Sequence, residues 1–294
     1  MRLRATADDE GARLDAFLAA PLGSRARAQR LIEAGAVRVD GEAVAKRHRL
    51  RAGELVSVEI APEPRVEDAQ PAPFAVPYRD EHLLVVDKPA GVVVHPARGH
   101  RTGTLAQALA GQAAGGEDTA RAGIVHRLDR NTSGLLVVAR TEAVHRALRA
   151  ALQGRAITRE YLALAEGRPP ARTGTIDAPL GRDRRVRTRR STDTDDPRGA
   201  VTHFAIERAL PRTTLLRVRL ETGRTHQIRA HLQAIGHPVA GDPEYGTPGR
   251  LGLERQFLHA ARLAFTHPVT GATVDVSSPL PSDLREALDR AAAE

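Results

Sequence analysis

The chain of 294 residues contains no cysteine and no tryptophan, and it has a single methionine. The lack of cysteine excludes disulfide bonds, thiolate metal sites, iron–sulfur clusters and a cysteine nucleophile. No apolar run approaches the roughly 20 residues that a membrane-spanning helix needs. The first residues also lack the apolar stretch of a signal peptide. We therefore expect a soluble, cytoplasmic protein that does not act at a membrane.

Lysine is nearly absent as well. Only Lys46 and Lys88 occur, which leaves 42 of the 44 basic residues as arginine. A genome rich in G and C produces the same bias, so the count alone assigns no partner. The formal net charge of +8 and the planar guanidinium, which suits phosphates and base stacking, nevertheless favour a nucleic acid as the partner. With 41% hydrophobic residues the chain can bury a core, which argues against disorder.

The N-terminal 62 residues have the pattern of a small module of helices and strands. Apolar residues recur at a helical spacing between Leu14 and Leu22, and residues 25–34 predict a second helix. Alternation over residues 37–39 and 56–60 predicts a short curled sheet. Three arginines on the second predicted helix are candidate RNA contacts, namely Arg25, Arg27 and Arg30.

The rest of the chain divides at a proline-rich stretch. Residues 63–75 have no periodic pattern and predict an extended linker. In residues 76–294, short apolar runs alternate with glycine and proline turns, and helical patterns occur at 142–152 and 225–235. This pattern is typical of an α+β domain built around one mixed or antiparallel sheet.

Several cofactor signatures are missing from the sequence. No G-x-G-x-x-G follows a predicted strand, neither lysine lies in a phosphate-binding P-loop, and the histidines form no H-E-x-x-H motif. We therefore expect no nucleotide cofactor, no metal and no other cofactor. Acid, base or carboxylate-nucleophile chemistry remains.

The densest polar cluster surrounds Asp129, which lies between Arg127 and Arg130 and shortly before an apolar run at 135–138. Neighbouring positive charges favour the ionised form of a carboxylate. An ionised aspartate suits nucleophilic or charge-stabilising chemistry at a sugar or a base. An aspartate that merely shapes a loop as an Asx turn would give the same pattern, and the residues alone leave both interpretations open.

The run His126-Arg-Leu-Asp129-x-x-Thr-Ser-Gly-Leu-Leu-Val-Val-Ala139 resembles the signature of the RluA-type pseudouridine synthases. Further motifs occur in the order that this family shows, so that the resemblance covers about residues 76–280. These motifs are Asp87–His95, Arg159–Leu164, Leu220–Leu232, Gly236–Asp242 and Leu258–Ala260. About 45 residues of the N-terminal module, from Arg13-Leu-Asp-x-x-Leu18 onward, resemble the S4 RNA-binding domain.

The resemblance implies that the protein isomerises uridine to pseudouridine in RNA. This reaction breaks the N1–C1′ bond, turns the base and rejoins it through C5, without a cofactor. The implied catalytic residue is Asp129, with Arg229 as the partner of its carboxylate. The implied role of Tyr161 is to stack on the target base, and its hydroxyl is a candidate for removal of the C5 proton. Whether Asp129 attacks C1′, adds to C6 or deprotonates C2′ stays open.

Other arginines are candidate RNA contacts. The resemblance implies that Arg127 enters the RNA where the uridine leaves, which offsets part of the cost of extruding a base. Arg224 precedes a predicted helix and is a candidate phosphate contact. The arginine-rich stretch 182–190 is either a solvated loop or an arm that follows phosphates.

The helix that carries Arg229 is predicted to begin at Thr225 as its N-cap and to end at Gly236. Arg229 is expected on its polar face, where it can reach a carboxylate. Its predicted buried stripe consists of Ile228, Leu232 and Ile235.

The predicted substrate is structured RNA. Family members with an S4 domain mostly modify large-subunit ribosomal RNA, with transfer RNA as an alternative, and we expect a monomer. A non-catalytic S4-type RNA-binding or ribosome-assembly protein is the alternative, but such a protein has no reason to keep Asp129, Tyr161 and Arg229 together. A glycosidase needs a second acid close to the first, and the sequence shows no acidic neighbour of Asp129.

Overall fold

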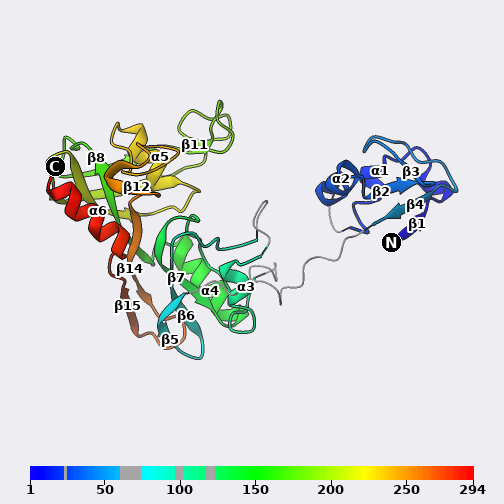
Figure 1. The fold of residues 1–294 in the computed structure, drawn as a ribbon. Helices are drawn as coiled ribbons and strands as arrows, with labels where there is room; N and C mark the ends of the chain where they lie inside the picture. The colour runs from blue at the N-terminus through cyan, green and yellow to red at the C-terminus, as the bar shows by residue number, and fades with distance from the viewer. Residues whose placement is uncertain (23–24, 60–73, 97–101, 117–122) are drawn as a thin grey trace. The chain divides into compact units, whose positions relative to one another are not determined.

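The computed structural model describes residues 1–22, 25–59, 74–96, 102–116 and 123–294 (Figure 1). The chain divides into two compact units, Met1–Asp68 and Ala69–Glu294, which are described separately below. The predicted linker at 63–75 lies almost wholly outside the described residues. Its extended conformation therefore stays a prediction.

The N-terminal unit folds around its own small core. Its four-stranded sheet has the order β1-β4-β2-β3, and every strand pair is antiparallel. Leu14, Leu18 and Ala28 of the helical part pack against Val37 and Val56 of the sheet. The two predicted helices and the short sheet are confirmed. The elements are β1 (Arg2–Arg4), η1 (Ala7–Asp9), α1 (Leu14–Phe17), α2 (Arg25–Glu33), β2 (Val37–Val39), β3 (Glu42–Ala43) and β4 (Leu55–Val58).

A buried carboxylate ties the two helices of this unit together. Asp15 on α1 accepts hydrogen bonds from Arg13 at 3.0 Å, from Arg25 at 3.1 Å and from Gln29 at 2.7 Å. The bond from Arg13, supported by Arg25 and Gln29, holds the pKa of Asp15 well below its usual range despite burial. Arg25 thus has a structural partner, although about half of its side chain is exposed. The side chains of Arg27 and Arg30 lie outside the described part of the chain.

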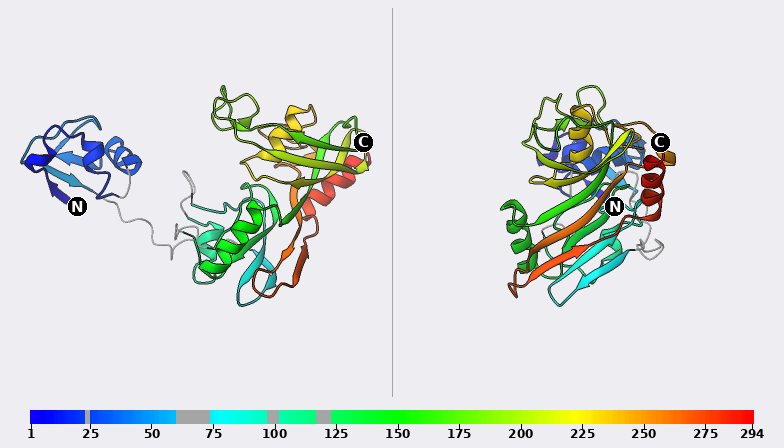
Figure 2. Two further views of the ribbon diagram at one scale, coloured as in Figure 1. Left: turned by 180° about the vertical axis from the view of Figure 1, so that it is seen from behind. Right: turned by 90° about the vertical axis from the view of Figure 1, so that its left-hand side faces the viewer.

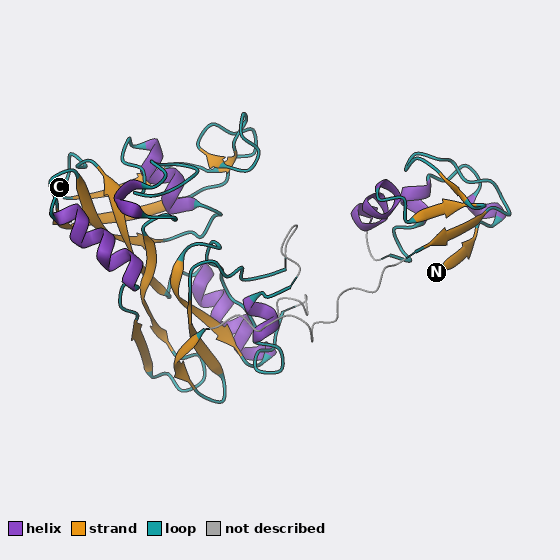
Figure 3. Ribbon diagram, in the orientation of Figure 1, coloured by secondary structure: helices purple, strands orange, loops and turns teal. Residues whose placement is uncertain are grey.

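The larger unit is a mixed α+β domain, as predicted (Figure 3). None of the helices in the described ranges is long and apolar enough to cross a membrane. Its strands are β5 (Ala75–Arg79), β6 (Leu83–Lys88), β7 (Ser133–Ala139), β8 (Thr158–Glu166), β9 (Thr173–Asp177), β10 (Gly181–Arg182), β11 (Arg190–Ser191), β12 (Val201–Ala209), β13 (Thr213–Leu220), β14 (Leu258–Thr266) and β15 (Thr273–Ser277). Its helices are α3 (Leu105–Ala108), α4 (Glu142–Gln153), α5 (Gln227–Ala234), η4 (Arg250–Gly252) and α6 (Ser282–Ala292).

One nine-stranded sheet organises this unit, in the order β5-β6-β7-β14-β8-β13-β12-β9, with β15 paired to β14. Its strand pairs are antiparallel except for β7 and β14, which run parallel. Alternate residues of β6 and β7 face two separate cores. One core includes residues of α3 and the other includes residues of α4, so the two helices cover opposite faces of these strands. Strand β14 therefore joins the half of the sheet that contains β7 to the half that contains β8.

The parallel contact depends on a glycine. Gly134 pairs with Ala260 at φ +111°, and a Cβ at this position would lie 2.3 Å from the carbonyl oxygen of Ala260. An alanine here would be strained at this positive φ, and its Cβ would collide with the backbone of Ala260, which is fixed in the sheet. The close approach of β7 to β14 is thus possible only without a side chain.

We expect Gly134→Ala to lower the free energy of unfolding of the larger unit by about 3 kcal/mol or more. Gly271→Ala is the matched control, because Gly271 also has a positive φ of +73° but no atom lies within 4 Å of its Cβ position. The control measures only the cost of placing a residue with a Cβ at positive φ, which is about 1–2 kcal/mol. Urea unfolding of both variants measures the difference, and equal losses would contradict the role of the collision.

Candidate active site

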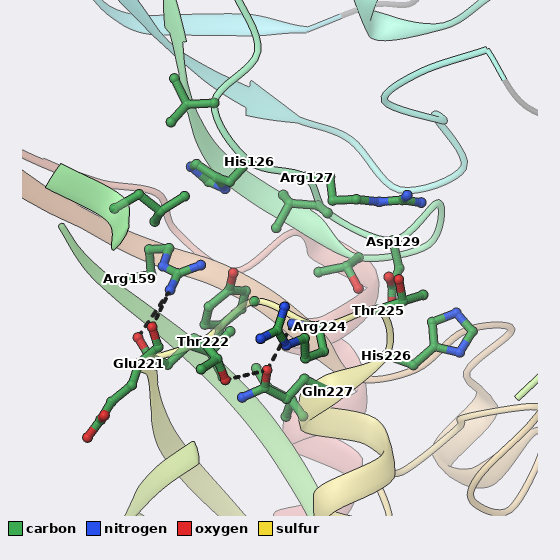
Figure 4. Close-up of a pocket in the computed structure, with 18 of the residues that line it drawn as sticks. His126, Arg127, Asp129, Arg159, Glu221, Thr222, Arg224, Thr225, His226 and Gln227 are labelled. Atoms are coloured by element: carbon green, nitrogen blue, oxygen red, sulfur yellow. Dashed lines mark hydrogen bonds between the residues drawn. The ribbon is translucent and has the colours of Figure 1, made fainter. Parts of the chain in front are cut away.

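A pocket of about 540 Å³ opens between the loop before β7, the start of β8 and the segment that leads into α5. Most of its lining residues come from three parts of the chain, 124–132, 149–161 and 220–229. Figure 4 shows Arg127 and Asp129 on the loop at the top of the pocket and Arg224–Gln227 below them. The pocket brings together the predicted residues Asp129, Tyr161, Arg229, Arg127 and Arg224.

The loop that carries Asp129 is held by cations bound to its backbone. Lys88 donates to the carbonyl of Arg130 at 3.0 Å, and Arg255 donates to the carbonyl of Asn131 at 3.0 Å. The side chain of Asp129 is 18% exposed. These bonds fix the backbone immediately after Asp129, so the carboxylate is presented from a rigid support.

Lys88 is a site residue to which the sequence analysis gave no role. Its ammonium is fully buried and donates to the carbonyls of Pro89 at 2.8 Å, Val92 at 3.0 Å and Arg130 at 3.0 Å. Burial lowers the pKa of Lys88 to about 7, although the negative charge of Asp129 acts in the opposite direction. Its signal in the sequence was its scarcity, since only one other lysine occurs.

The depressed pKa of Lys88 predicts a specific pH dependence. Between pH values of about 7 and 10.5, the pKa of Lys88 in the folded and in the unfolded chain, the unfolded chain binds more protons. The contribution of Lys88 to the free energy of unfolding therefore rises as pH rises through this window and falls as pH falls. We expect the unfolding free energy of the wild type to rise relative to that of Lys88→Met, by at most about 1.4 kcal/mol per pH unit. Urea unfolding at pH 7, 8 and 9 measures this difference; a constant difference would contradict the shift.

Arg229 is the centre of the charged network. Its Nε and Nη2 bind both oxygens of Asp242 at 2.6 and 2.8 Å, its Nη2 also binds Glu244 at 3.0 Å, and its Nη1 reaches Asp129 Oδ2 at 3.3 Å. The guanidinium carbon lies 4.8 Å from the ring centre of Tyr245. Burial acts to lower the pKa of Arg229, but the carboxylates, above all that of Asp242, raise it on balance. The predicted pairing of Arg229 with Asp129 is present in the structure.

Two details of the predicted helix around Arg229 are wrong. Helix α5 begins at Gln227, and its N-cap is His226 in a left-handed conformation with φ 56°, not Thr225. Ile235 is 37% exposed and does not belong to the buried stripe, whereas Arg229 is buried. Ile228 and Leu232 are buried as predicted, whereas Ile235 is the C-cap residue and follows the last helical residue, Ala234. Arg229 is buried because it forms an ion pair with the buried Asp242.

The carboxylates beside Arg229 were missed as well. Asp242 is fully buried, and its Oδ1 also accepts the backbone N–H of Glu244 at 2.9 Å. The expectation that no acid lies close to Asp129 is therefore wrong. Both Asp242 and Glu244 are ion-paired to Arg229, so neither is the free proton donor that glycosidase chemistry requires.

Tyr161 lies on β8 between β13 and β14, opposite Val218 and Ala260. It is 5% exposed and lines the pocket, so it contributes both to the core and to the pocket wall. Burial raises the pKa of Tyr161, with the charge of Asp129 acting in the same direction. The phenol is therefore neutral at physiological pH, which suits a stacking surface better than a base.

Three further side chains line the pocket, one neutral imidazole and two exposed guanidinium groups. Burial, aided by Arg159, lowers the pKa of His126 to about 3, so this ring is neutral; its Nε2 accepts the N–H of Val137 at 3.3 Å. Arg127 is exposed and makes no hydrogen bond or ion pair with the residues that the structure describes. Arg224 is exposed, with its Nε bonded to the carbonyl of Gly199 at 3.1 Å.

The arginine-rich stretch 182–190 forms the hairpin of β10 and β11, which lies beside α5 and reaches beyond the sheet (Figures 1 and 2). The hydroxyl of Tyr245 accepts the N–H of Arg190 at 2.7 Å and lies 3.0 Å from Nδ1 of His226. Tyr245 thus connects the hairpin to the network of Arg229. A second pocket of about 570 Å³ shares Arg224 with the first and is also lined by Arg182, Arg190 and Arg198.

Within the described ranges, no three histidine, aspartate or glutamate side chains are grouped so that they could hold a metal ion. The chemical groups that line the pocket include two carboxylates, Asp129 and Glu221, together with the phenol of Tyr161, three imidazoles and several guanidinium groups. This set can position a nucleotide, stabilise negative charge and supply one nucleophile or base.

Comparison with known proteins gives consistent matches. The family model for RNA pseudouridylate synthase matches residues 82–234, and the model for the S4 domain matches residues 12–56. An uncharacterised RNA pseudouridine synthase of Bacillus subtilis, YlyB, is 42% identical over 98% of this chain and 96% of its own length. Ribosomal large subunit pseudouridine synthase D of Xanthomonas campestris is 43% identical over 94% of this chain and 87% of its own length.

A solved structure shows the same fold. The human protein RNA pseudouridylate synthase domain containing 1 superimposes with a TM-score of 0.56 at 28% identity, covering 71% of this chain and 84% of its own. Residues 82–234, which the family model matches, include the loop of Asp129, strand β8 and helix α5.

Proposed function

The chain belongs to the RNA pseudouridylate synthase family, and on this premise we propose that it isomerises specific uridines of large-subunit ribosomal RNA, with Asp129 as the catalytic residue. The observation that carries the proposal is the ion pair of Asp129 with Arg229, 3.3 Å long, in a pocket that Tyr161 also lines. Enzymes of this family act on RNA as isomerases, so the open questions are which residues act and on which RNA.

In the proposed mechanism, Arg229 holds the carboxylate of Asp129 at the ribose of a uridine that has left its stack. Tyr161 stacks on the uracil and keeps it in the pocket while the N1–C1′ bond breaks and C5 turns toward C1′. Arg127, whose exposed guanidinium has no partner in the described part of the chain, fills the place that the base vacated. The hydroxyl of Tyr161 is the candidate for removal of the C5 proton, although its raised pKa favours stacking as its main role.

Ribosomal RNA is the favoured substrate for two reasons. Relatives that match nearly the whole chain are named as synthases of the large ribosomal subunit, and residues 12–56 match the S4 domain. Transfer RNA is the alternative, and we propose a cytoplasmic monomer. The proposed RNA contacts are Arg127, Arg224, Arg25, Arg27 and Arg30.

The test is a map of pseudouridines in ribosomal RNA from cells with the gene, without it, and with the Asp129→Asn form in its place. We expect at least one pseudouridine that disappears with the gene and does not return with Asp129→Asn. If the pseudouridine returns with Asp129→Asn, the assigned catalytic residue is wrong. A change in ribosome assembly without a change in any pseudouridine would favour the non-catalytic RNA-binding alternative.

We further propose that residues 1–62 act as a separate RNA-binding domain. Removal of this segment should leave a folded catalytic unit, because each unit has its own core. Each lost phosphate contact lowers the slope of log affinity against log salt by about 0.9. Because two tethered binding sites reinforce each other, we expect the shortened protein to bind RNA more weakly, with a higher KM and a shallower salt slope. Its kcat should stay nearly unchanged, because the pocket residues all remain.

Titration of both forms with one ribosomal RNA fragment at several salt concentrations measures these slopes. Equal affinities and equal slopes would mean that residues 1–62 do not touch this RNA.

A further inference from the structure

Arg159 is a pocket residue that the mechanism above leaves unused. It lies on β8 two residues before Tyr161, so both side chains point to the same face of the strand. Both line the pocket. Arg159 is only 6% exposed, which is unusual for a residue that always carries a positive charge.

The guanidinium of Arg159 is poorly satisfied for a buried cation. A buried arginine normally pairs with a carboxylate, but Arg159 has no ion pair with any residue in the described ranges. Its Nη2 donates to the carbonyls of Leu220 and Glu221 at 3.3 and 3.4 Å, and its buried Nε has no acceptor among the residues that the structure describes. Unmet buried donors cost free energy, so these groups suit an acceptor that arrives with the substrate.

The surroundings leave the guanidinium at the pocket wall. Two carboxylates near Arg159 are engaged by other cations. Glu221, whose backbone carbonyl accepts from Arg159, pairs through its side chain with Arg155 and His203. The adjacent Glu160 pairs with Arg217 and Arg262. A Cβ at Gly223 would lie 2.9 Å from Nη1 of Arg159, so the guanidinium packs against bare backbone where a side chain would displace it. Gly223 itself lines the pocket.

The position of Arg159 relative to Asp129 indicates what it meets. Figure 4 shows the two residues on opposite sides of the pocket. If the ribose lies at Asp129 and the uracil stacks on Tyr161, the edge of the base farthest from C1′ faces Arg159. That edge carries the acceptor O4. We propose that Arg159 donates hydrogen bonds to O4 of the target uracil, an inference that rests on the function proposed above.

This contact has a chemical consequence. When the N1–C1′ bond breaks, its electron pair goes to the base, while Asp129 either bonds to C1′ or takes the C2′ proton. The base is then an anion whose charge is shared by O2 and O4. It is neutralised when C5 bonds to C1′, as the bond from Asp129 to C1′ breaks or Asp129 returns its proton to C2′. Transfer of the C5 proton to N1 completes the product. A fixed guanidinium at O4 stabilises this anion without rearrangement.

The same contact has a consequence for specificity. Cytosine presents an amino donor where uracil presents O4. Two sets of donors facing each other in a buried site repel, so Arg159 would reject cytidine at the target position. Arg159 would thus act both on the rate and on the choice of base.

The experiment uses the RNA fragment identified by pseudouridine mapping, with uridine or cytidine at the target position. Affinities are measured in the Asp129→Asn background, where no conversion occurs, and turnover is measured with Asp129 present. We expect Arg159→Met to reduce the preference for uridine over cytidine by about 10-fold or more and turnover by about 100-fold. Arg159→Lys, which keeps the charge and one donor, should lose less of both.

Arg155→Met is the matched control, since it removes an equal charge from a mostly exposed side chain on the same pocket. It should weaken binding of both RNAs by the same factor. Thermal unfolding confirms that each variant is folded, and Arg159→Lys serves if Arg159→Met is not.

Unchanged preference and turnover in a folded Arg159 variant would overturn the assignment. Equal weakening of both RNAs would also overturn it, because the residue would then contact the RNA backbone. If the wild type forms no pseudouridine in any RNA, the proposed function itself fails; normal conversion by a folded Arg159→Met variant rejects only the role of Arg159.

Discussion

Asp129→Asn should abolish pseudouridine formation while leaving RNA binding within a few-fold of the wild type. The substitution keeps the shape of the side chain and removes the charge that the chemistry requires, so turnover should fall by at least about 10⁴-fold. Stability should change little, because Arg229 keeps Asp242 and Glu244 as partners. Single-turnover assays with excess enzyme measure the chemical step separately from binding.

A companion variant distinguishes chemistry from loop structure. Asp129→Ala should be as inactive as Asp129→Asn, since neither can act as a nucleophile or as a base. Measurable turnover of either variant near that of the wild type would show that Asp129 does not carry the reaction. Loss of RNA binding in parallel with activity would show that the carboxylate organises the RNA surface instead.

Arg229→Met should cost both stability and activity. The substitution leaves the fully buried Asp242 without its cation, and breaking a buried pair in this way costs about 3–5 kcal/mol. It also frees the carboxylate of Asp129, so turnover should fall by about 100-fold or more in the protein that remains folded. Thermal unfolding and turnover below the melting temperature measure the two effects. Arg146→Met is the control, because Arg146 and its ion-pair partner Glu142 are both mostly exposed, and the substitution should cost less than about 1 kcal/mol.

The double variant Arg229→Met with Asp242→Asn separates the two roles of Arg229. Because this variant no longer buries an unpaired charge at position 242, most of the lost stability should return. Turnover should stay low, because the carboxylate of Asp129 still lacks its bond from Arg229. Recovery of activity together with stability would mean that Arg229 acts only as a structural residue.

Local patterns in the sequence predict strand β7 and the polar loop that precedes it. The apolar run at 135–138 lies within β7, and the polar loop before it holds Asp129 in the pocket. The pairing of Asp129 with Arg229 was also expected, but through the family resemblance rather than through the residues themselves. In a chain with 42 arginines, composition cannot indicate which one reaches a given carboxylate.

The missed residues are those whose roles depend on tertiary contacts. Asp242 acts through Arg229 on helix α5, and Lys88 contacts the carbonyl of Arg130 on a distant loop. The start of α5 was misplaced because His226 adopts the left-handed region, which is uncommon for a residue other than glycine. Arg229 was expected on the polar face of its helix, but its burial is predictable only when the buried Asp242 is known.

The distance along the chain between Asp129 and Arg229 also affects a newly made molecule. Arg229 lies 100 residues after Asp129, and Arg255, which holds the loop of Asp129, follows later still. Synthesis proceeds from the N-terminus at about 5–20 residues per second, so an interval on the order of ten seconds separates these residues. The N-terminal unit has its complete core long before that. On the proposal that residues 1–62 bind RNA by themselves, we expect a growing chain to hold RNA before it can modify it, and a chain released early to bind without reacting.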